Sequence, residues 1–384
     1  MEKFIEAEKQ SRAAFRTLPG IGSQRLRLLI AYFGSAQAAW LAPIEDYLTW
    51  GEAPWALKVL PLRKGINPAL IKERLDLEGI STVIPEEEHY PRLLAELTDA
   101  PPILYYKGQL RPSKEALAIV GSRRATAYGK AAAGFLSREV AAKGIVIVSG
   151  LARGIDTAAH EGALAAHGET WAFLGNGLDR IYPPENRKLA QRILENGVLL
   201  SEFTPGTPPE ARHFPARNRL ISGCSRGVVV VEAAQKSGAL ITVDFALEQG
   251  REVFAVPGPI FSEMSKGTHY LLRLGAKIVE GTEDIWAEIP SWLEVYSDKS
   301  KEKIGIKSCA TNRLINTNST VSTTDQEIGL AILDLLSDIP LHIDQIVLSS
   351  TYPAGGIALT LLELQLNGEI EQLPGQCYIL ARKC

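Results

Sequence analysis

The sequence predicts an α/β protein whose core is a mostly parallel, doubly wound sheet. Short apolar runs recur about 20 to 30 residues apart between Leu117 and Val279, and they are continuous rather than alternating. Continuous runs rich in β-branched residues are typical of strands covered on both faces. Amphipathic stretches such as 128–143 and 156–167 separate these runs. The repeat is therefore βα, and an extended Rossmann-like sheet is expected. The runs are 117–120, 145–148, 171–174, 198–200, 228–231, 253–256 and 277–279.

Composition sets the class of protein. The 384 residues are 46 % hydrophobic and 22 % charged, which is close to globular averages and excludes disordered or collagen-like chains. The chain begins without an apolar signal segment, and no run reaches the roughly 18 apolar residues of a membrane span, so we expect a cytoplasmic protein without membrane contact. The four cysteines lack CxxC spacing and are expected to be reduced thiols. A net charge of −3 disfavours a histone-like electrostatic binder, so any nucleic-acid site must be local.

Residues 1–78 are expected to form a small helical domain of the SAM or helix-hairpin-helix kind. Apolar residues at helical spacing, such as Leu26, Leu29 and Phe33, predict a helix after the turn at 19–22. That turn, Pro-Gly-Ile-Gly, is similar to the hairpin with which helix-hairpin-helix modules present backbone amides to a DNA phosphate. A purely structural helix entry is the alternative. The core follows over 79–296, and the prolines of its lead-in at 79–115 suit one or two edge strands.

The carboxy-terminal part of the sequence predicts a linker and a further domain. Residues 297–324 are rich in Ser, Thr, Asn and Lys and cannot bury a core, which predicts a flexible linker. Residues 325–384 regain periodicity, with helices expected at 328–336, 342–348 and 356–367 and a β-hairpin over 369–380. This order is typical of a winged helix. A three-helix interaction module is the alternative.

Three glycine-containing turns follow strands of the predicted sheet, and each bears a serine and a cation. At such a turn the free amide hydrogens and the dipole of the next helix attract an anion. Because the carboxyl ends of parallel strands share one sheet edge, we expect the three turns to form one anion-binding pocket, although tight turns alone are the alternative. The residues expected there are Gly121, Ser122 and Arg123, then Ser149, Gly150 and Arg153, and finally Lys236, Ser237, Gly238, Ala239 and Leu240.

A basic cluster at 213–219 adds an aromatic residue to the positive charge. Arg217 and Asn218 follow Phe214, a mixture that suits phosphate clamping beside a stacked base. The alternative is that Arg217 and Arg219 pair with core carboxylates such as Glu202 or Glu232.

Dinucleotide, triphosphate and catalytic sites find little support. The first turn, GlySerArgArgAlaThr, lacks GxGxxG, and no GxxxxGK[ST] occurs. The histidines show no metal-ligand spacing, and His160 is expected to pair with Asp156 on one helix face. No serine has a visible general base. We therefore expect no catalytic residue, no metal and no cofactor.

An ordered set of motifs spanning about residues 80 to 280 resembles the bacterial DNA-processing protein A (DprA/Smf) family. They include TyrProArgLeuLeu at 90–94, IleValGlySerArgArgAlaThrAlaTyrGly at 119–129 and SerGlyLeuAlaArgGlyIleAspThrAlaAlaHis at 149–160. The others lie at 101–108, 175–186, 201–203, 214–223, 230–242 and 256–259. The order of the terminal domains also matches, with looser motifs.

The resemblance implies a non-enzymatic, homodimeric protein that binds single-stranded DNA and loads the RecA recombinase on DNA entering during natural transformation. It implies DNA contacts at Gly121, Ser122 and Arg123 and at Lys236 to Leu240. A separate hypothesis of ours is that Leu240 presses on a base. The alternative is a nucleotide-processing enzyme similar to phosphoribohydrolases. Those enzymes carry ProGlyGlyxGlyThr with a nearby catalytic Glu, whereas this chain has LysSerGlyAlaLeuIleThr at 236–242.

Overall fold

The chain divides into two compact units, Met1–Gly305 and Ile306–Cys384. The computed structural model describes residues 2–50, 54–112, 115–289, 292, 329, 331–333, 335–336, 341–343, 346–347, 354–373 and 377–380. The predicted linker at 297–324 lies outside these residues. The predicted boundary between 78 and 79 stays a prediction, and both sides of it belong to the first unit.

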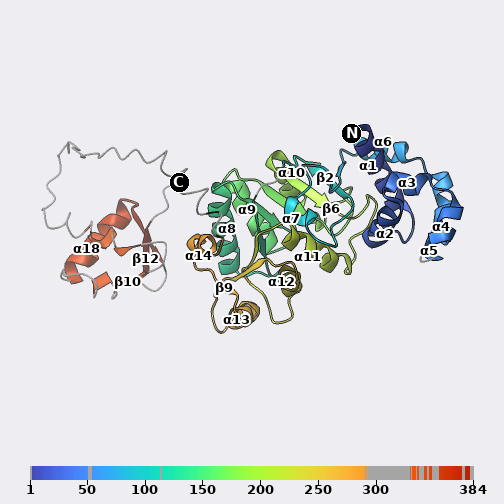
Figure 1. Cartoon of the computed structure of the whole chain (residues 1–384). Coiled ribbons are helices and arrows are strands. Elements are labelled where there is room, and N and C mark those ends of the chain that lie inside the picture. Colours follow the sequence, from blue (N-terminus) through green and yellow to red (C-terminus); the bar gives the residue numbers. More distant parts are fainter. Residues whose placement is uncertain are drawn as a thin grey trace. The chain divides into compact units, whose positions relative to one another are not determined.

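Short helices open the first unit (Figure 1, blue). They are α1 (Glu2–Thr17), α2 (Ser23–Phe33), α3 (Ala36–Leu41), α4 (Ile44–Trp50), α5 (Pro54–Val59), the 3-10 helix η1 (Leu60–Gly65) and α6 (Pro68–Leu77). The expected glycine-rich entry to α2 is present, because Gly20 has φ +76° and accepts a hydrogen bond from Arg25 at 2.8 Å. A DNA contact at this turn stays a prediction.

Within the described residues, nine strands form one sheet in the order β1-β2-β6-β5-β4-β3-β7-β8-β9. They are β1 (Ser81–Val83), β2 (Leu104–Gly108), β3 (Ala116–Val120), β4 (Val146–Ser149), β5 (Thr170–Phe173), β6 (Val198–Ser201), β7 (Gly227–Val230), β8 (Glu252–Ala255) and β9 (Lys277–Ile278). The seven neighbouring strands β6, β5, β4, β3, β7, β8 and β9 pair in parallel. Strand β2 runs antiparallel to β6, and β1 runs antiparallel to β2. The Rossmann-like, mostly parallel sheet is confirmed. The lead-in supplies one edge strand, β1, and an inner strand, β2.

Helices cover both faces of the sheet, which explains the continuous apolar runs (Figure 1). On β3, Ala118 belongs to the cluster under α11 and α12, whereas its neighbours Leu117 and Ile119 belong to the cluster under α8 and α9. Farther along that second face, Leu199 joins a cluster shared by α10 and the amino-terminal helices. The helices of the core are α7 (Arg92–Ala95), α8 (Ala127–Ala142), α9 (Ile155–Ala165), α10 (Arg187–Asn196), α11 (His213–Gly223), α12 (Gly238–Glu248), α13 (Lys266–Arg273) and α14 (Thr282–Glu288), with 3-10 helices η2 (Pro184–Asn186) and η3 (Glu263–Ser265).

The second unit contains a helix and a small antiparallel sheet around its own buried cluster. Its elements include β10 (Leu341–His342), α18 (Ala354–Leu366), β11 (Ile370–Leu373) and β12 (Cys377–Leu380). The expected third helix and hairpin are confirmed. The expectation that the second helix begins at His342 is wrong, because Leu341 and His342 pair with β12 as a third strand. The described residues of 329–335 are helical, in agreement with the first predicted helix.

Candidate nucleic-acid interface

The three predicted turns lie side by side, because they follow the neighbouring strands β4, β3 and β7. A pocket of about 730 Å³, here called the main pocket, lies over these strand ends and is walled by α11 and α12. Eight of the predicted site residues line it: Gly121, Ser122, Arg123, Arg217, Asn218, Ser237, Gly238 and Ala239. The other five, Ser149, Gly150, Arg153, Lys236 and Leu240, do not.

The turn after β3 is shaped to present two arginines. A Cβ on Gly121 would lie 2.6 Å from Ile155 and 2.8 Å from the Glu232 carbonyl, so only glycine fits there. Ser122 is buried, and its hydroxyl accepts a hydrogen bond from the Arg124 amide at 3.0 Å. Arg123 and Arg124 are exposed and line the main pocket. The turn therefore offers guanidinium groups, whereas its serine maintains the local backbone.

The start of α8 is occupied by a carboxylate of this chain. Glu232, at the end of β7, accepts hydrogen bonds from the Thr126 amide at 2.9 Å and the Thr126 hydroxyl at 2.5 Å. The residue is 2 % exposed. Because Glu232 already supplies the negative charge that this helix start attracts, a phosphate is not expected to bind these donors.

The backbone amides of the turn after β4 are also hydrogen-bonded to a carboxylate of this chain. Asp156 turns its carboxylate back onto the amides of Gly150 and Ala152, at 3.2 and 3.3 Å. Ser149 is fully buried and donates its hydroxyl to the Ile119 carbonyl at 2.7 Å. Burial raises the pKa of Asp156, and the nearby Arg217 opposes this shift. The sequence predicted an external anion at this turn, whereas in the structure the chain's own Asp156 accepts hydrogen bonds from these amides. The structure therefore does not support a phosphate contact by Ser149 or Gly150.

Arg217 is 3 % exposed and spans two strand ends. Its guanidinium donates to the carbonyls of Gly150, at 2.6 Å, and of Phe173. Burial lowers its pKa to about 10, although the nearby Asp156 favours the charged form. The Arg217 Nε also donates to the Asn218 side-chain oxygen at 3.2 Å. Both alternatives for Arg217 need correction, because its hydrogen bonds go to two backbone carbonyls and an amide side chain rather than to a core carboxylate, and a buried, occupied guanidinium cannot clamp phosphate without rearrangement.

Arg219, two residues farther along α11, forms the ion pair with a core carboxylate that was the alternative to phosphate clamping. It pairs with Glu202, as that alternative predicted, and with Asp99 at 3.1 Å. Arg219 therefore stabilises the core rather than clamping phosphate.

The start of α12 remains open. Among the described residues, the Ser237 hydroxyl accepts one hydrogen bond, a long one of 3.3 Å from the Ala239 amide. Gly238 is exposed, and a Cβ added to it would meet nothing within 4 Å. Asn218 holds this turn by donating to the Gly238 carbonyl at 3.3 Å. Of the three predicted turns, this one leaves room beside its backbone amides for an external anion.

Lys236 and Leu240 flank this open helix start. Lys236 is exposed, and within the described residues its side chain forms no ion pair or hydrogen bond. Leu240 is half-buried and packs against the core, whereas its neighbour Ile241, 36 % exposed, lines the main pocket. The hypothesis that Leu240 presses on a base stays a prediction, and the apolar side chain of Ile241 is the one of these two that lines the main pocket.

Two aromatic side chains line the main pocket, and neither was among the predicted site residues. Phe214 and Tyr182 line the pocket with ring centroids 5.8 Å apart, and the Arg123 guanidinium lies 4.9 Å from the Phe214 ring centre. Arg153 lies in a small adjoining cavity, where it pairs with Glu185. Both partners are exposed, so this pair is easily exchanged for another anion. Phe214 stood in the basic cluster that the sequence indicated, but Tyr182 carried no local signal.

His160 lies beneath the turn after β4 and is fully buried. The expected pairing with Asp156 is wrong. Its Nε2 accepts from the Leu151 amide at 3.3 Å, and its Nδ1 lies 2.7 Å from the Thr170 hydroxyl, which itself donates to the Ile147 carbonyl. This network requires a neutral ring with the proton on Nδ1. Burial lowers the pKa of His160 to about 3.

We expect acid to weaken the fold through His160. Because the pKa in the folded state lies below the value of about 6.5 in the unfolded state, the neutral ring's contribution is complete above pH 6.5 and is lost as the pH falls toward 3. Between pH 7 and 4.5 this costs about 2–3 kcal/mol of unfolding free energy. Urea unfolding of the parent and His160→Gln at both pH values measures it. An equal pH dependence in the two proteins would exclude His160 as the cause.

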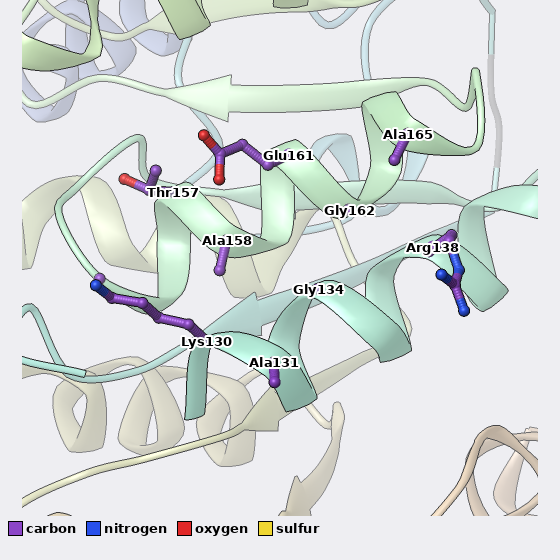
Figure 2. A pocket seen from close by; sticks show the side chains of 10 residues that line it. Lys130, Ala131, Gly134, Arg138, Thr157, Ala158, Glu161, Gly162 and Ala165 are labelled. Atoms are coloured by element: carbon purple, nitrogen blue, oxygen red, sulfur yellow. The ribbon is translucent and has the colours of Figure 1, made fainter. Parts of the chain in front are cut away.

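A groove of about 520 Å³ lies between α8 and α9 (Figure 2). Its floor consists of small residues, and a Cβ on Gly162 would lie 2.4 Å from the Gly134 carbonyl oxygen. Lys130 and Arg138 project from α8, and Glu161 projects from α9 (Figure 2). The groove follows from the close packing of the two helices, and we assign it no ligand.

The part of the chain that the structure describes lacks both the residue cluster of a metal site and the helix of a membrane span. No group of three or more His, Cys, Asp or Glu side chains there could hold a metal ion. No described helix is long and apolar enough to cross a membrane.

Two family models match this chain. Residues 81–290 match the model described as DNA recombination-mediator protein A, and residues 319–376 match the DprA winged helix domain. The second match confirms the predicted winged helix.

Similar proteins extend over most of the chain. It is 35 % identical over 386 residues to Protein Smf of Synechocystis sp., covering 95 % of this chain and 97 % of that protein. It is 46 % identical over 215 residues to the DNA processing protein DprA of Bacillus subtilis, covering 56 % of this chain and 72 % of that protein. The X-ray structure of DNA processing protein A from Streptococcus pneumoniae is similar, with a TM-score of 0.63, 35 % identity and coverage of 74 % of this chain and 96 % of that one.

Proposed function

Because this chain belongs to the DNA recombination-mediator protein A family, we propose that it binds single-stranded DNA in the main pocket. The observation that carries the proposal is that the open start of α12 lines the same pocket as Arg123 and Arg124. Free backbone amides and guanidinium groups are the donors that phosphate prefers. The carboxylates Asp156 and Glu232 are engaged by amides of this chain, so they do not occupy these donors.

The remaining walls of the main pocket suit bases rather than phosphates. Phe214, Tyr182 and Ile241 provide aromatic and apolar surface beside the two arginines. A base can stack on such a surface only when it has left a duplex, and stacking contributes about 1–3 kcal/mol per base with little sequence preference. A duplex would offer the pocket its phosphates alone. Single strands should therefore bind more tightly.

We further propose that the DNA-bound protein acts in the cytoplasm as a homodimer and loads the RecA recombinase during natural transformation. The support for this part is family membership. DNA binding without catalysis is favoured over nucleotide processing, because Asp156, the carboxylate that lines the main pocket, is buried and hydrogen-bonded to two amides. A general base of a hydrolase would need to reach its substrate.

The test is a titration of labelled single strands and duplexes at salt concentrations between about 50 and 200 mM. We expect single strands to bind more tightly and log K to fall linearly with log salt concentration, with a slope of about −0.7 for each phosphate neutralised. Absence of binding at the lowest salt would contradict the proposal. Incubation with nucleoside monophosphates, followed by chromatography, would then reveal base release if the protein is a nucleotide-processing enzyme.

A further inference from the structure

A second basic pocket, of about 430 Å³, lies between β2, α10 and the loop that follows β5. Lys107 on β2, Arg180 in the loop and Arg187 at the start of α10 line it. In the described part of the chain, none of these three side chains forms an ion pair or a hydrogen bond. Three unpaired cations from three separate elements therefore share one cavity.

The lining of the second basic pocket carries more positive than negative charge. Against its three cations stands one acidic lining residue, Asp179, whose Oδ1 accepts a hydrogen bond from the Gly206 amide at 2.7 Å. Leu178, Ile181 and Leu194 supply apolar surface. Like charges gathered in one cavity repel each other, and a bound anion relieves this repulsion. The chemistry suits a phosphodiester whose sugar or base lies on the apolar wall.

One loop separates this pocket from the main pocket. Asp179, Arg180 and Ile181 face the second basic pocket, whereas the next residue, Tyr182, lines the main pocket. Arg153 lies in the small cavity beside Tyr182. Cations therefore continue from Arg123 past Arg153 to Arg180, along both sides of this loop.

We propose that the second basic pocket binds phosphates of the same DNA strand that occupies the main pocket, after the strand has crossed the loop at 178–183. This inference rests on the proposed function. It assigns DNA contacts to Lys107, Arg180 and Arg187. A free phosphate or a nucleotide shares the same chemistry, so the test must separate these sources.

The test compares Arg180→Ala/Arg187→Ala with the matched control Lys188→Ala/Arg192→Ala. The control removes the same charge from exposed positions of α10 that do not line the pocket. Fluorescence anisotropy is measured with a strand of about 6 nucleotides, which fills only the main pocket, and with one of about 20, which can reach both. All three proteins are first compared by thermal unfolding, and Arg180→Gln/Arg187→Gln replaces the alanine variant if that one fails to fold.

We expect the pocket variant to bind the long strand about tenfold or more weakly, with a salt slope reduced by about 1–2, and to bind the short strand like the parent. Equal long-strand affinity in the pocket and control variants would overturn the inference. The inference would also be overturned if the parent bound inorganic phosphate and the pocket variant lost this binding while its long-strand affinity stayed unchanged. Failure of the parent to bind even the short strand would instead refute the proposed function.

Discussion

Arg217→Met is expected to lower the free energy of unfolding by about 3–5 kcal/mol, the cost of breaking a buried charge network. The substitution keeps much of the side-chain volume but leaves the Gly150 and Phe173 carbonyls without their donor. It also removes the positive charge near the buried Asp156. Chemical denaturation followed by tryptophan fluorescence measures the loss.

Arg123→Ala is the matched control, because Arg123 lines the same pocket but is exposed. Its unfolding free energy should stay within about 0.5 kcal/mol of the parent's. If Arg217→Met instead kept the parent's stability and lost DNA affinity, the result would support the sequence-based prediction that Arg217 contacts a DNA phosphate.

Arg123→Ala/Lys236→Ala is expected to weaken single-strand binding by about 100-fold or more. Each lost charge-assisted hydrogen bond to phosphate is worth about 1.5–3 kcal/mol, and together they exceed two factors of ten. The salt slope should become shallower by about 1–2. Both side chains are exposed, so the fold should be unaffected.

Arg138→Ala/Lys143→Ala provides the control for this double variant. It removes two positive charges from α8 and its carboxy-terminal cap, at positions that do not line the main pocket. Its affinity should remain close to the parent's. Equal losses in both double variants would mean that net charge, rather than the main pocket, governs binding.

The layout of the core could be predicted from the sequence because its determinants are local. Strands buried on both faces need continuous apolar runs, and the helices between them need one apolar face, so the βα repeat is visible along the chain. The two-residue strand β10 was not predicted, because it is defined by its pairing with β12 and not by a local sequence pattern. The inner position of β2 was missed for the same reason, since β6 lies about 90 residues farther along the chain.

The sequence by itself determined that amide-rich turns, each ready for an anion, would meet at one edge of the sheet. Only the tertiary structure decided which anion the turn after β3 holds, because Glu232 accepts a hydrogen bond from Thr126 across 106 positions and no local pattern predicts that contact. The turn after β4 is capped locally, since Asp156 lies four residues beyond Ala152, but only the folded chain brings Arg217 close to this carboxylate. An amide cluster attracts whichever negative charge the fold brings within hydrogen-bond distance. Two turns therefore hold carboxylates of this chain. At the start of α12, where none of the described residues brings a carboxylate to the amides, we propose that a DNA phosphate binds.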